Sequence, residues 1–234
     1  MVMALRPDGM ILTPPLCDNP EVLAALRDSG TPCALISPEA DPEDLPSVRM
    51  DDAHAAEEMT NLLISLGHRC IAFIKGARDQ AATKLRYRGF VAAMKAHKLP
   101  VDKELVYQGD FTFATGLEAA HHLLSRSQRP TAVFASNDEM ALGVLAAAQR
   151  LKLNVPGDLS IAGFDDTPAS NRIWPSLTTV RQPMDEMARA AVEMLIASNR
   201  GGDKQAPHRV LPHELVVRDS TSAPAGLPGG RRKR

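Results

Sequence analysis

The sequence is poor in aromatic residues and contains no long hydrophobic run. Phe, Trp and Tyr together make up 4% of the 234 residues, so we expect a core built mainly from Ala, Val, Leu, Ile and Met. A transmembrane helix needs about 20 consecutive apolar residues, and no stretch approaches that length. The opening segment, "MVMALRPDGMILTPP", is interrupted by Arg6, Pro7 and Asp8, which argues against a signal peptide. These absences predict a cytoplasmic location and no membrane partner.

The chain also lacks a charge excess and a cysteine pattern. The formal net charge is -1, whereas a domain that grips DNA usually carries a clear excess of basic residues. Cys17, Cys33 and Cys70 are widely spaced and form no CxxC pair, which favours reduced thiols in the cytosol. Hydrophobic content of 44% and charged content of 24% are ordinary for a globular protein.

What the chain does have is a regular alternation of strand-like and helix-like segments up to residue 164. The helix-like segments carry apolar residues at helical spacing, and several begin at a capping Asn or Asp. Such alternation is typical of an α/β protein with parallel sheets covered on both faces. The expected strands are residues 9–13, 32–37, 47–50, 70–74, 104–111, 131–136 and 159–164.

The order changes after residue 180. A long helix is predicted there, with Met187, Ala191, Met194 and Leu195 on one face, and residues 208–220 predict one or two final strands. Residues 221–234 are rich in Pro and Gly and end in "RRKR". We expect this segment to be a disordered, solvated tail rather than a nucleic-acid contact.

Seven motifs occur in order at compatible spacings. They are "PDGMILTPP" (7–15), "LGHRCIAFI" (66–74), "RYRGF" (86–90), "PTAVFASNDEMALGVLAA" (130–147), "VPGDLSIAGFDD" (155–166), "SLTTVRQP" (176–183) and "LPHELVVRDST" (211–221). Together they resemble the effector-binding region of LacI/GalR-family transcription regulators. The "GFDD" and "LTTVRQP" motifs separate these regulators from periplasmic sugar-binding proteins of the same architecture.

The resemblance implies two doubly wound parallel-sheet subdomains of the periplasmic-binding-protein type, joined by three crossover strands. A small effector, usually a sugar or nucleobase, is expected to close between them. The N-terminal subdomain should hold residues 1–75 and 182–206, and the C-terminal subdomain residues 76–181 and 207–220. The intact regulator is expected to be a homodimer that changes its grip on operator DNA when the effector shifts its conformation.

The sequence departs from the family pattern at its start. Nothing before "PDGMILTPP" matches the helix-turn-helix headpiece, the hinge or the first two strand–helix units. We therefore expect an incomplete N-terminal subdomain, and operator DNA contact only through a headpiece that this chain does not contain. A fragment or a misplaced start is the favoured explanation.

Two ligand-binding candidates, Asp165 and Arg86, lie where expected strands end, which is where open parallel sheets bind ligands. The Asp165 carboxylate can accept two hydroxyl hydrogen bonds at once, and it matches the family's ligand-binding acid. Its alternative role is an N-cap or a strand-end turn, and the neighbouring Asp166 is expected to cap the following turn. Arg86 offers a fork of donors for hydroxyls or a carboxylate and matches the family's ligand-contacting arginine. A surface ion pair is its alternative.

Three further candidates are weaker. Phe111 supplies an apolar face for a sugar ring or base, or is an ordinary core residue. The neighbouring Phe113 is the other candidate for the ligand-facing role. Asn137 binds a ligand hydroxyl or only caps the helix that follows. The resemblance also implies a contact from Gln80, whereas Ala82 lacks the polar side chain that some relatives have there.

No pattern predicts catalysis, a metal or a cofactor. The segment "DDAH" (51–54) precedes a helix, where capping by Asp51 or Asp52 is favoured over metal binding. The chain has no GxSxG elbow, P-loop or GxGxxG motif. Adjacent Asp165 and Asp166 diverge, whereas glycosidases need opposed acids. A solute-binding protein for sugar uptake is the alternative function.

Overall fold

The computed structural model describes residues 7–198 and 207–225, and the chain forms two compact units. The first unit comprises the described residues of Met1–Asp51, Asp79–Ala82 and Pro183–Pro212. The second comprises those of Asp52–Arg78, Thr83–Gln182 and His213–Arg234. The α/β class is confirmed, since each unit is built around a parallel sheet.

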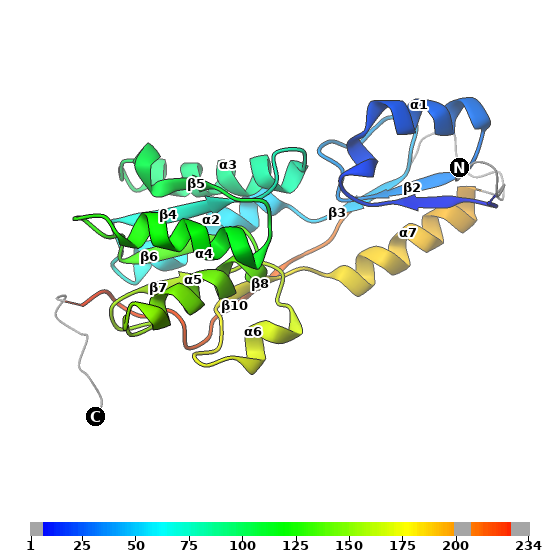
Figure 1. Ribbon diagram of the computed structural model, residues 1–234. Helices are drawn as coiled ribbons and strands as arrows, with labels where there is room; N and C mark the ends of the chain where they lie inside the picture. The colour runs from blue at the N-terminus through cyan, green and yellow to red at the C-terminus, as the bar shows by residue number, and fades with distance from the viewer. Residues whose placement is uncertain (1–6, 199–206, 226–234) are drawn as a thin grey trace. The chain divides into compact units, whose positions relative to one another are not determined.

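The first unit is a four-stranded parallel sheet in the order β1-β2-β3-β9, with a helix on each face (Figure 1). Asn19 caps the first helix by accepting hydrogen bonds from the backbone of Glu21 and Val22, and Gly30 ends it in the left-handed conformation. The elements are β1 (Met10–Leu12), η2 (Leu16–Asp18), α1 (Pro20–Ser29), β2 (Cys33–Ile36), β3 (Ser47–Arg49), α7 (Met184–Ser198) and β9 (His208–Val210).

The core of the first unit follows the alternation of side chains along β2. Cys33 and Leu35 belong to the cluster that contains Leu26 of α1, while Ala34 belongs to the cluster that contains Met187 and three other residues of α7. Because successive strand residues point to opposite faces, one strand supports both helices. The predicted apolar face of the helix after residue 183 is thereby confirmed.

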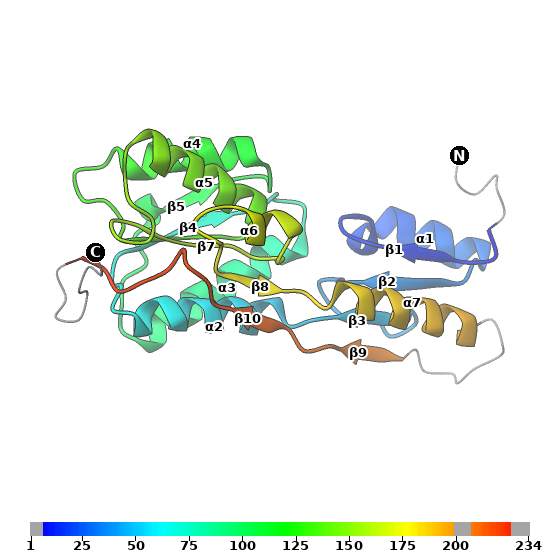
Figure 2. The same cartoon turned by 90° about the horizontal axis from the view of Figure 1, so that it is seen from below.

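The second unit is a four-stranded parallel sheet in the order β5-β4-β6-β7, accompanied by an antiparallel pair, β10-β8. Figure 2 shows α4 and α5 on one face of the larger sheet and α2 and α3 on the other. The elements are α2 (Asp52–Ser65), β4 (Ile71–Lys75), α3 (Ala81–Ala96), η3 (Lys103–Leu105), β5 (Val106–Gln108), α4 (Phe113–Leu124), β6 (Ala132–Ala135), α5 (Asp138–Arg150), β7 (Ser160–Ala162), α6 (Pro168–Arg172), β8 (Thr179–Arg181) and β10 (Glu214–Val216).

Helices α4 and α5 cross closely because a glycine on each faces the backbone of the other. A Cβ on Gly116 would collide with the Met140 backbone, and one on Gly143 would collide with the backbone of Phe113 and Leu117. The small residues of α5, Ala141, Ala147 and Ala148, are fully buried in the same cluster. This crossing fixes the beginning of α5, where several site residues lie.

The division of the chain differs from the expected one at residues 52–75, 79–82, 182 and 207–212. Residues 52–75 lie in the second unit, because β4 hydrogen-bonds to β5 and β6 in the middle of its sheet. Residues 207–212 lie in the first unit, because β9 pairs with β3. The chain passes between the units at residues 51–52, 182–183 and 212–213, and residues 79–82 form a further short segment that belongs to the first unit.

Two local predictions also need correction. The strand expected at residues 104–111 is shorter, since Lys103–Leu105 forms a 3-10 helix and the strand covers only Val106–Gln108. Residues 221–225 are not a loose tail. Thr221 bonds to the Thr178 hydroxyl, while the Ser222 backbone bonds to Ser160 and His68. The basic "RRKR" end lies outside the described residues.

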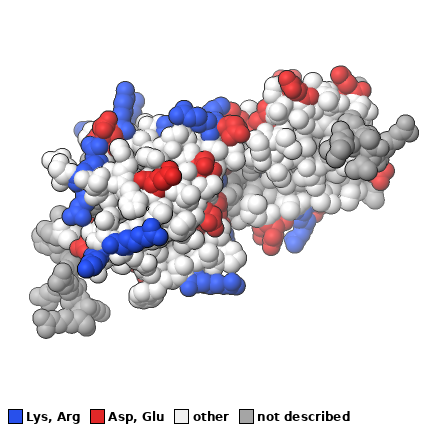
Figure 3. All heavy atoms as spheres, in the orientation of Figure 1, with Lys and Arg blue, Asp and Glu red and all other residues white. Residues whose placement is uncertain are grey.

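The surface carries both signs of charge. On the face drawn in Figure 3, Lys and Arg side chains are interspersed with Asp and Glu rather than gathered into one basic stripe. Within residues 7–198 and 207–225, no helix is long and apolar enough to cross a membrane.

Candidate ligand site

The candidate site lies at the carboxyl edge of the larger sheet in the second unit. Because β4, β5, β6 and β7 run parallel, their last residues, Lys75, Gln108, Ala135 and Ala162, end at one edge. Of the predicted ligand residues, Phe111, Asn137 and Asp165 follow these strands, and Arg86 lies in the second turn of α3, the helix after β4. The position is the one that open parallel sheets use for ligands.

Arg86 is buried at this edge and makes several contacts. It is 5% exposed, and its Nε donates to Asp52 Oδ1 at 2.7 Å while its Nη1 donates to the backbone oxygen of Ser136 at 2.7 Å. The guanidinium carbon lies 3.7 Å from the centre of the Phe164 ring. The expected alternative of a surface ion pair is therefore wrong, because the pair that Arg86 makes is buried.

Asp165 is the partly open acid of the site. Its Oδ1 accepts a hydrogen bond from Gln182 Nε2 at 2.6 Å and lies 3.6 Å from Arg86 Nη1. Its side chain is 28% exposed. Burial raises the pKa of the Asp165 carboxyl, and the Arg86 charge and the Gln182 hydrogen bond offset this only in part.

The backbone at Asp165 and Asp166 is held in an unusual conformation. Their φ angles are 127° and 57°, in the region that side chains other than glycine rarely adopt. The Asp165 N–H donates to Val180 O at 2.8 Å, so the chain continues along β8 beyond the end of β7. Such a conformation costs on the order of 1–3 kcal/mol and is commonest at functional sites.

Asp166 has a different role from Asp165. Its carboxylate accepts hydrogen bonds from Arg181, Arg218 and the Ser170 hydroxyl. Burial favours a higher pKa for Asp166, but the two arginines outweigh it and the pKa is lowered. The residue joins the loop to β8 and the segment after β10 instead of capping the backbone of the next turn.

Phe111 and Asn137 are connected to each other and, through the chain, to Arg86. The Asn137 side chain accepts from the Met140 backbone as the cap of α5, and its Nδ2 donates to Phe111 O at 2.9 Å. Asn137 directly follows Ser136, whose oxygen binds Arg86. The half-buried Phe111 ring covers Gly76, where any Cβ would collide with it. The cap thus engages the amide oxygen of Asn137, and the bond to Phe111 engages its amide nitrogen.

Gln80, the fifth predicted residue, falls outside the second unit. It lies just before α3 and belongs by its contacts to the first unit, whereas Arg86, Asp165, Phe111 and Asn137 belong to the second.

Sequence reasoning missed two residues of the cluster. Asp52, the first residue of α2, was expected to be only a cap, yet it is 5% exposed and holds Arg86. Gln182 binds Asp165, and it stands within the "LTTVRQP" motif, in which the sequence indicated no ligand residue. A pattern search could flag Gln182, but only the fold reveals Asp52, which is 34 residues from its partner.

A second buried acid lies beneath the site. Asp138 begins α5 and accepts hydrogen bonds from the hydroxyl of Thr179 at 2.6 Å and the backbone of Thr167 at 2.7 Å. Burial raises the pKa of Asp138 to about 6, and the charge of Asp165 adds to the shift. No group of three acids, histidines or cysteines suited to a metal occurs among residues 7–198 and 207–225.

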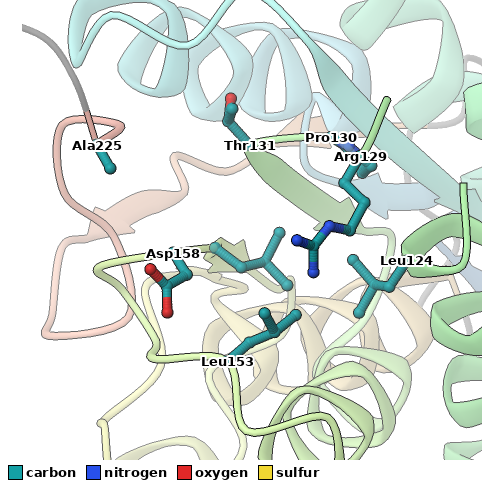
Figure 4. Close-up of a pocket in the computed structure, with 8 residues that line it drawn as sticks. Leu124, Arg129, Pro130, Thr131, Leu153, Asp158 and Ala225 are labelled. Carbon is teal, nitrogen blue, oxygen red and sulfur yellow. The ribbon is translucent and has the colours of Figure 1, made fainter. Parts of the chain in front are cut away.

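A pocket of about 410 Å³ opens elsewhere in the second unit (Figure 4). Its wall includes Thr131 and Leu159, which immediately precede β6 and β7. It therefore lies at the amino ends of these strands, away from Asp165. Its other lining residues are Leu124, Arg129, Pro130, Leu153, Asp158 and Ala225.

Comparison with known proteins agrees with this architecture. The family described as "Periplasmic binding protein-like domain" matches residues 60–221. The chain is 38% identical over 225 residues to the HTH-type transcriptional repressor CytR of Escherichia coli K12, covering 95% of this chain and 65% of CytR. It is 36% identical over 202 residues to catabolite control protein A of Priestia megaterium, covering 86% of this chain and 61% of that protein. The chain thus spans less than two thirds of the length of these relatives.

Solved structures lead to the same family. A LacI transcriptional regulator of Bacillus cereus subsp. cytotoxis superposes with a TM-score of 0.88 at 30% identity, covering 95% of this chain and 79% of that one. The cellobiose complex of the transcriptional regulator CelR superposes with a TM-score of 0.85 at 32% identity, covering 91% of this chain and 65% of the other. The chain belongs to the LacI/GalR family and corresponds to its periplasmic-binding-protein-like effector-binding region.

Proposed function

We propose that this chain is the effector-sensing part of a LacI-type transcription regulator, and that its effector is a sugar or similar small polar molecule bound at Asp165 and Arg86. The observation that carries the proposal is the state of Asp165. Its carboxylate is held by Gln182 and Arg86 on one oxygen, and its side chain remains 28% exposed. A fixed, partly open carboxylate at this edge of the sheet suits a ligand hydroxyl.

Each neighbouring residue has a distinct part in this proposal. Arg86, tied to Asp52 and Ser136, holds its charge beside Asp165 without being exposed itself. Phe111 offers an apolar ring face near the same strand ends, suited to the carbon face of a sugar. Asn137 keeps Phe111 in place through the backbone bond at 2.9 Å. Catalysis is not part of the proposed function.

Sensing requires that the effector bind one conformation of the regulator better than another. We propose that the intact protein is a dimer. The difference in effector affinity between its conformations would change how its two DNA-binding modules are positioned on an operator. The named relatives are regulators, and CelR is described in complex with cellobiose, which supports sensing over solute uptake. Dimer formation, DNA binding and a cytoplasmic location all belong to the proposal.

A thermal-shift screen tests it. The chain is melted with cellobiose, ribose, glucose and a set of nucleosides. A true effector at about 100 times its Kd stabilises the folded state by about 2.7 kcal/mol, a rise in Tm of several degrees. We expect Asp165→Asn to remove this rise and Asp158→Asn, an exposed acid at the other end of the sheet, to keep it. A rise in Tm of the Asp165→Asn protein equal to that of the wild type would contradict the proposed site.

A further inference from the structure

The charges around Asp165 narrow the class of ligand, an inference that rests on the proposed function. Arg86 is the cation that faces this carboxylate, at 3.6 Å. Its charge is already matched by Asp52, with 2.7 Å between Nε and Oδ1, and its Nη1 is bound to the Ser136 oxygen. The single positive charge of Arg86 is therefore shared between two carboxylates, those of Asp52 and Asp165.

The acids at this edge outnumber the cations that act on them. Besides Asp52 and Asp165, Glu139 lies in the first turn of α5 with an exposed side chain, and Asp138 is buried beside it. Burial comes first among the causes that raise the pKa of Asp165, and the charges of Asp52 and Glu139 raise it further. Arg86 carries one positive charge against the three carboxylates of Asp52, Asp165 and Glu139, so the net formal charge of these four side chains is negative.

The other arginines near the loop do not change this balance. Arg181 and Arg218 both bind the carboxylate of Asp166, and Arg181 also binds Glu214. Lys75, at the end of β4, has its ammonium 3.7 Å from the centre of the Tyr87 ring. Arg86 is the cation that lowers the pKa of Asp165, against the two acids that raise it.

Asp165 itself can only accept hydrogen bonds while ionised. Oδ1 receives Gln182 and faces Arg86, and within the described residues no hydrogen bond reaches Oδ2. We infer that the site selects an uncharged ligand rich in hydroxyl or amine donors, and rejects the phosphorylated or carboxylated form of the same ligand. Like charges held a few ångströms apart at a protein surface repel each other, and this repulsion distinguishes the neutral form of a ligand from the anionic one.

Matched pairs of probes test this inference by calorimetry at pH 7.5. The pairs are ribose with ribose 5-phosphate, glucose with glucuronate, and adenosine with adenosine monophosphate. We expect the neutral member of any pair that binds to be at least about tenfold tighter than the anionic member. An anionic member that binds as tightly or more tightly would overturn the inference and leave the proposed function standing. If no member of any pair binds, the proposed function fails, and the inference fails with it.

Two surface variants give a matched test of the cause. Glu139→Gln removes one exposed acid near Asp165, and Asp158→Asn removes one exposed acid that lines the pocket at the opposite edge. We expect Glu139→Gln to reduce the preference for the neutral probe about threefold, since a partly screened charge has a modest effect. Asp158→Asn should leave the ratio unchanged. Equal ratios in both variants would show that acids at this edge do not set the selectivity and would refute the inference.

Discussion

The Nη1 atom of Arg86 lies 3.6 Å from Oδ1 of Asp165, within the distance of an ion pair but beyond hydrogen-bond length. The shorter bonds of Arg86, each 2.7 Å, run to Asp52 and Ser136. Arg86 is thus fixed by the protein's own groups and acts on Asp165 by charge. This arrangement leaves the carboxylate oriented and able to accept a donor from outside.

Replacing Arg86 is expected to affect folding as well as binding. Arg86→Ala leaves the buried Asp52 without its charged partner. Breaking such a pair costs about 3–5 kcal/mol. Urea denaturation of Arg86→Ala should show this loss.

Arg126→Ala is the matched control for that measurement. Arg126 pairs with Glu104 at 3.3 Å, but Glu104 is largely exposed. Surface pairs contribute roughly 0–1 kcal/mol, so this variant should unfold close to the wild-type midpoint. Similar losses in the two variants would mean that the Arg86 pair is not buried in solution.

Asp138 should make stability depend on pH. Burial raises the pKa of Asp138 to about 6, above its ordinary value in the unfolded chain, so the folded state holds the proton more tightly. The contribution of protonated Asp138 to the free energy of unfolding is complete at the lowest pH and is lost as the pH rises through about 6. Asp138→Asn mimics the protonated form. Between pH 4 and pH 7, the free energy of unfolding of this variant should rise by on the order of 3 kcal/mol relative to that of the wild type. Parallel Tm curves for the two proteins across this range would rule out the shift.

His68 should hold the segment after β10 against the sheet. Its Nδ1 contacts the Thr131 hydroxyl at 2.9 Å, and its Nε2 contacts Ser160 at 3.0 Å and the Ser222 oxygen at 2.9 Å. We expect His68→Ala to cost about 1–3 kcal/mol and to speed hydrogen exchange at the Ser222 amide. The exposed His97→Ala should do neither. Unchanged exchange at Ser222 would contradict the anchoring role.

The same histidine gives a pH dependence of opposite sign. Burial lowers the pKa of His68, so the folded state favours the neutral ring. The contribution of the neutral His68 ring to stability is present above the ordinary histidine pKa of about 6.5. It is lost as the pH falls through the lowered pKa of the folded state. The wild type should therefore lose stability relative to His68→Ala on acidification below pH 6.5, and a constant difference would exclude this.

The fold was predictable because the residues that specify each helix and strand lie within or beside that segment. Asn19 and Gly30 mark the ends of α1, and the short apolar runs around Leu35 and Phe134 are the strands that the structure contains. The assignment of β4 and β9 to their sheets was not predictable. Which strand lies beside which is decided by packing over long sequence distances, as in the pairing of Val48 with Arg209.

The candidate site was predictable in part for the same reason. Asp165 follows a strand and stands within a motif, so both signals identify it. The burial of Arg86 and its pairing with Asp52 depend on how α2 and α3 pack on one sheet, which no local pattern encodes. Asn137 was equally readable as a ligand contact or a cap, and only its bonds to Met140 and Phe111 reveal the cap.

The most direct test of the central claim is amide chemical-shift mapping of the isotope-labelled chain, titrated with the neutral probe that gives the largest thermal shift. The account predicts that the strongest changes fall on Ser136, Asp165 and Gln182, with little change at Arg129 and Leu153 in the pocket at the opposite edge. The strongest changes at Arg129 and Leu153, with Asp165 unmoved, would contradict it.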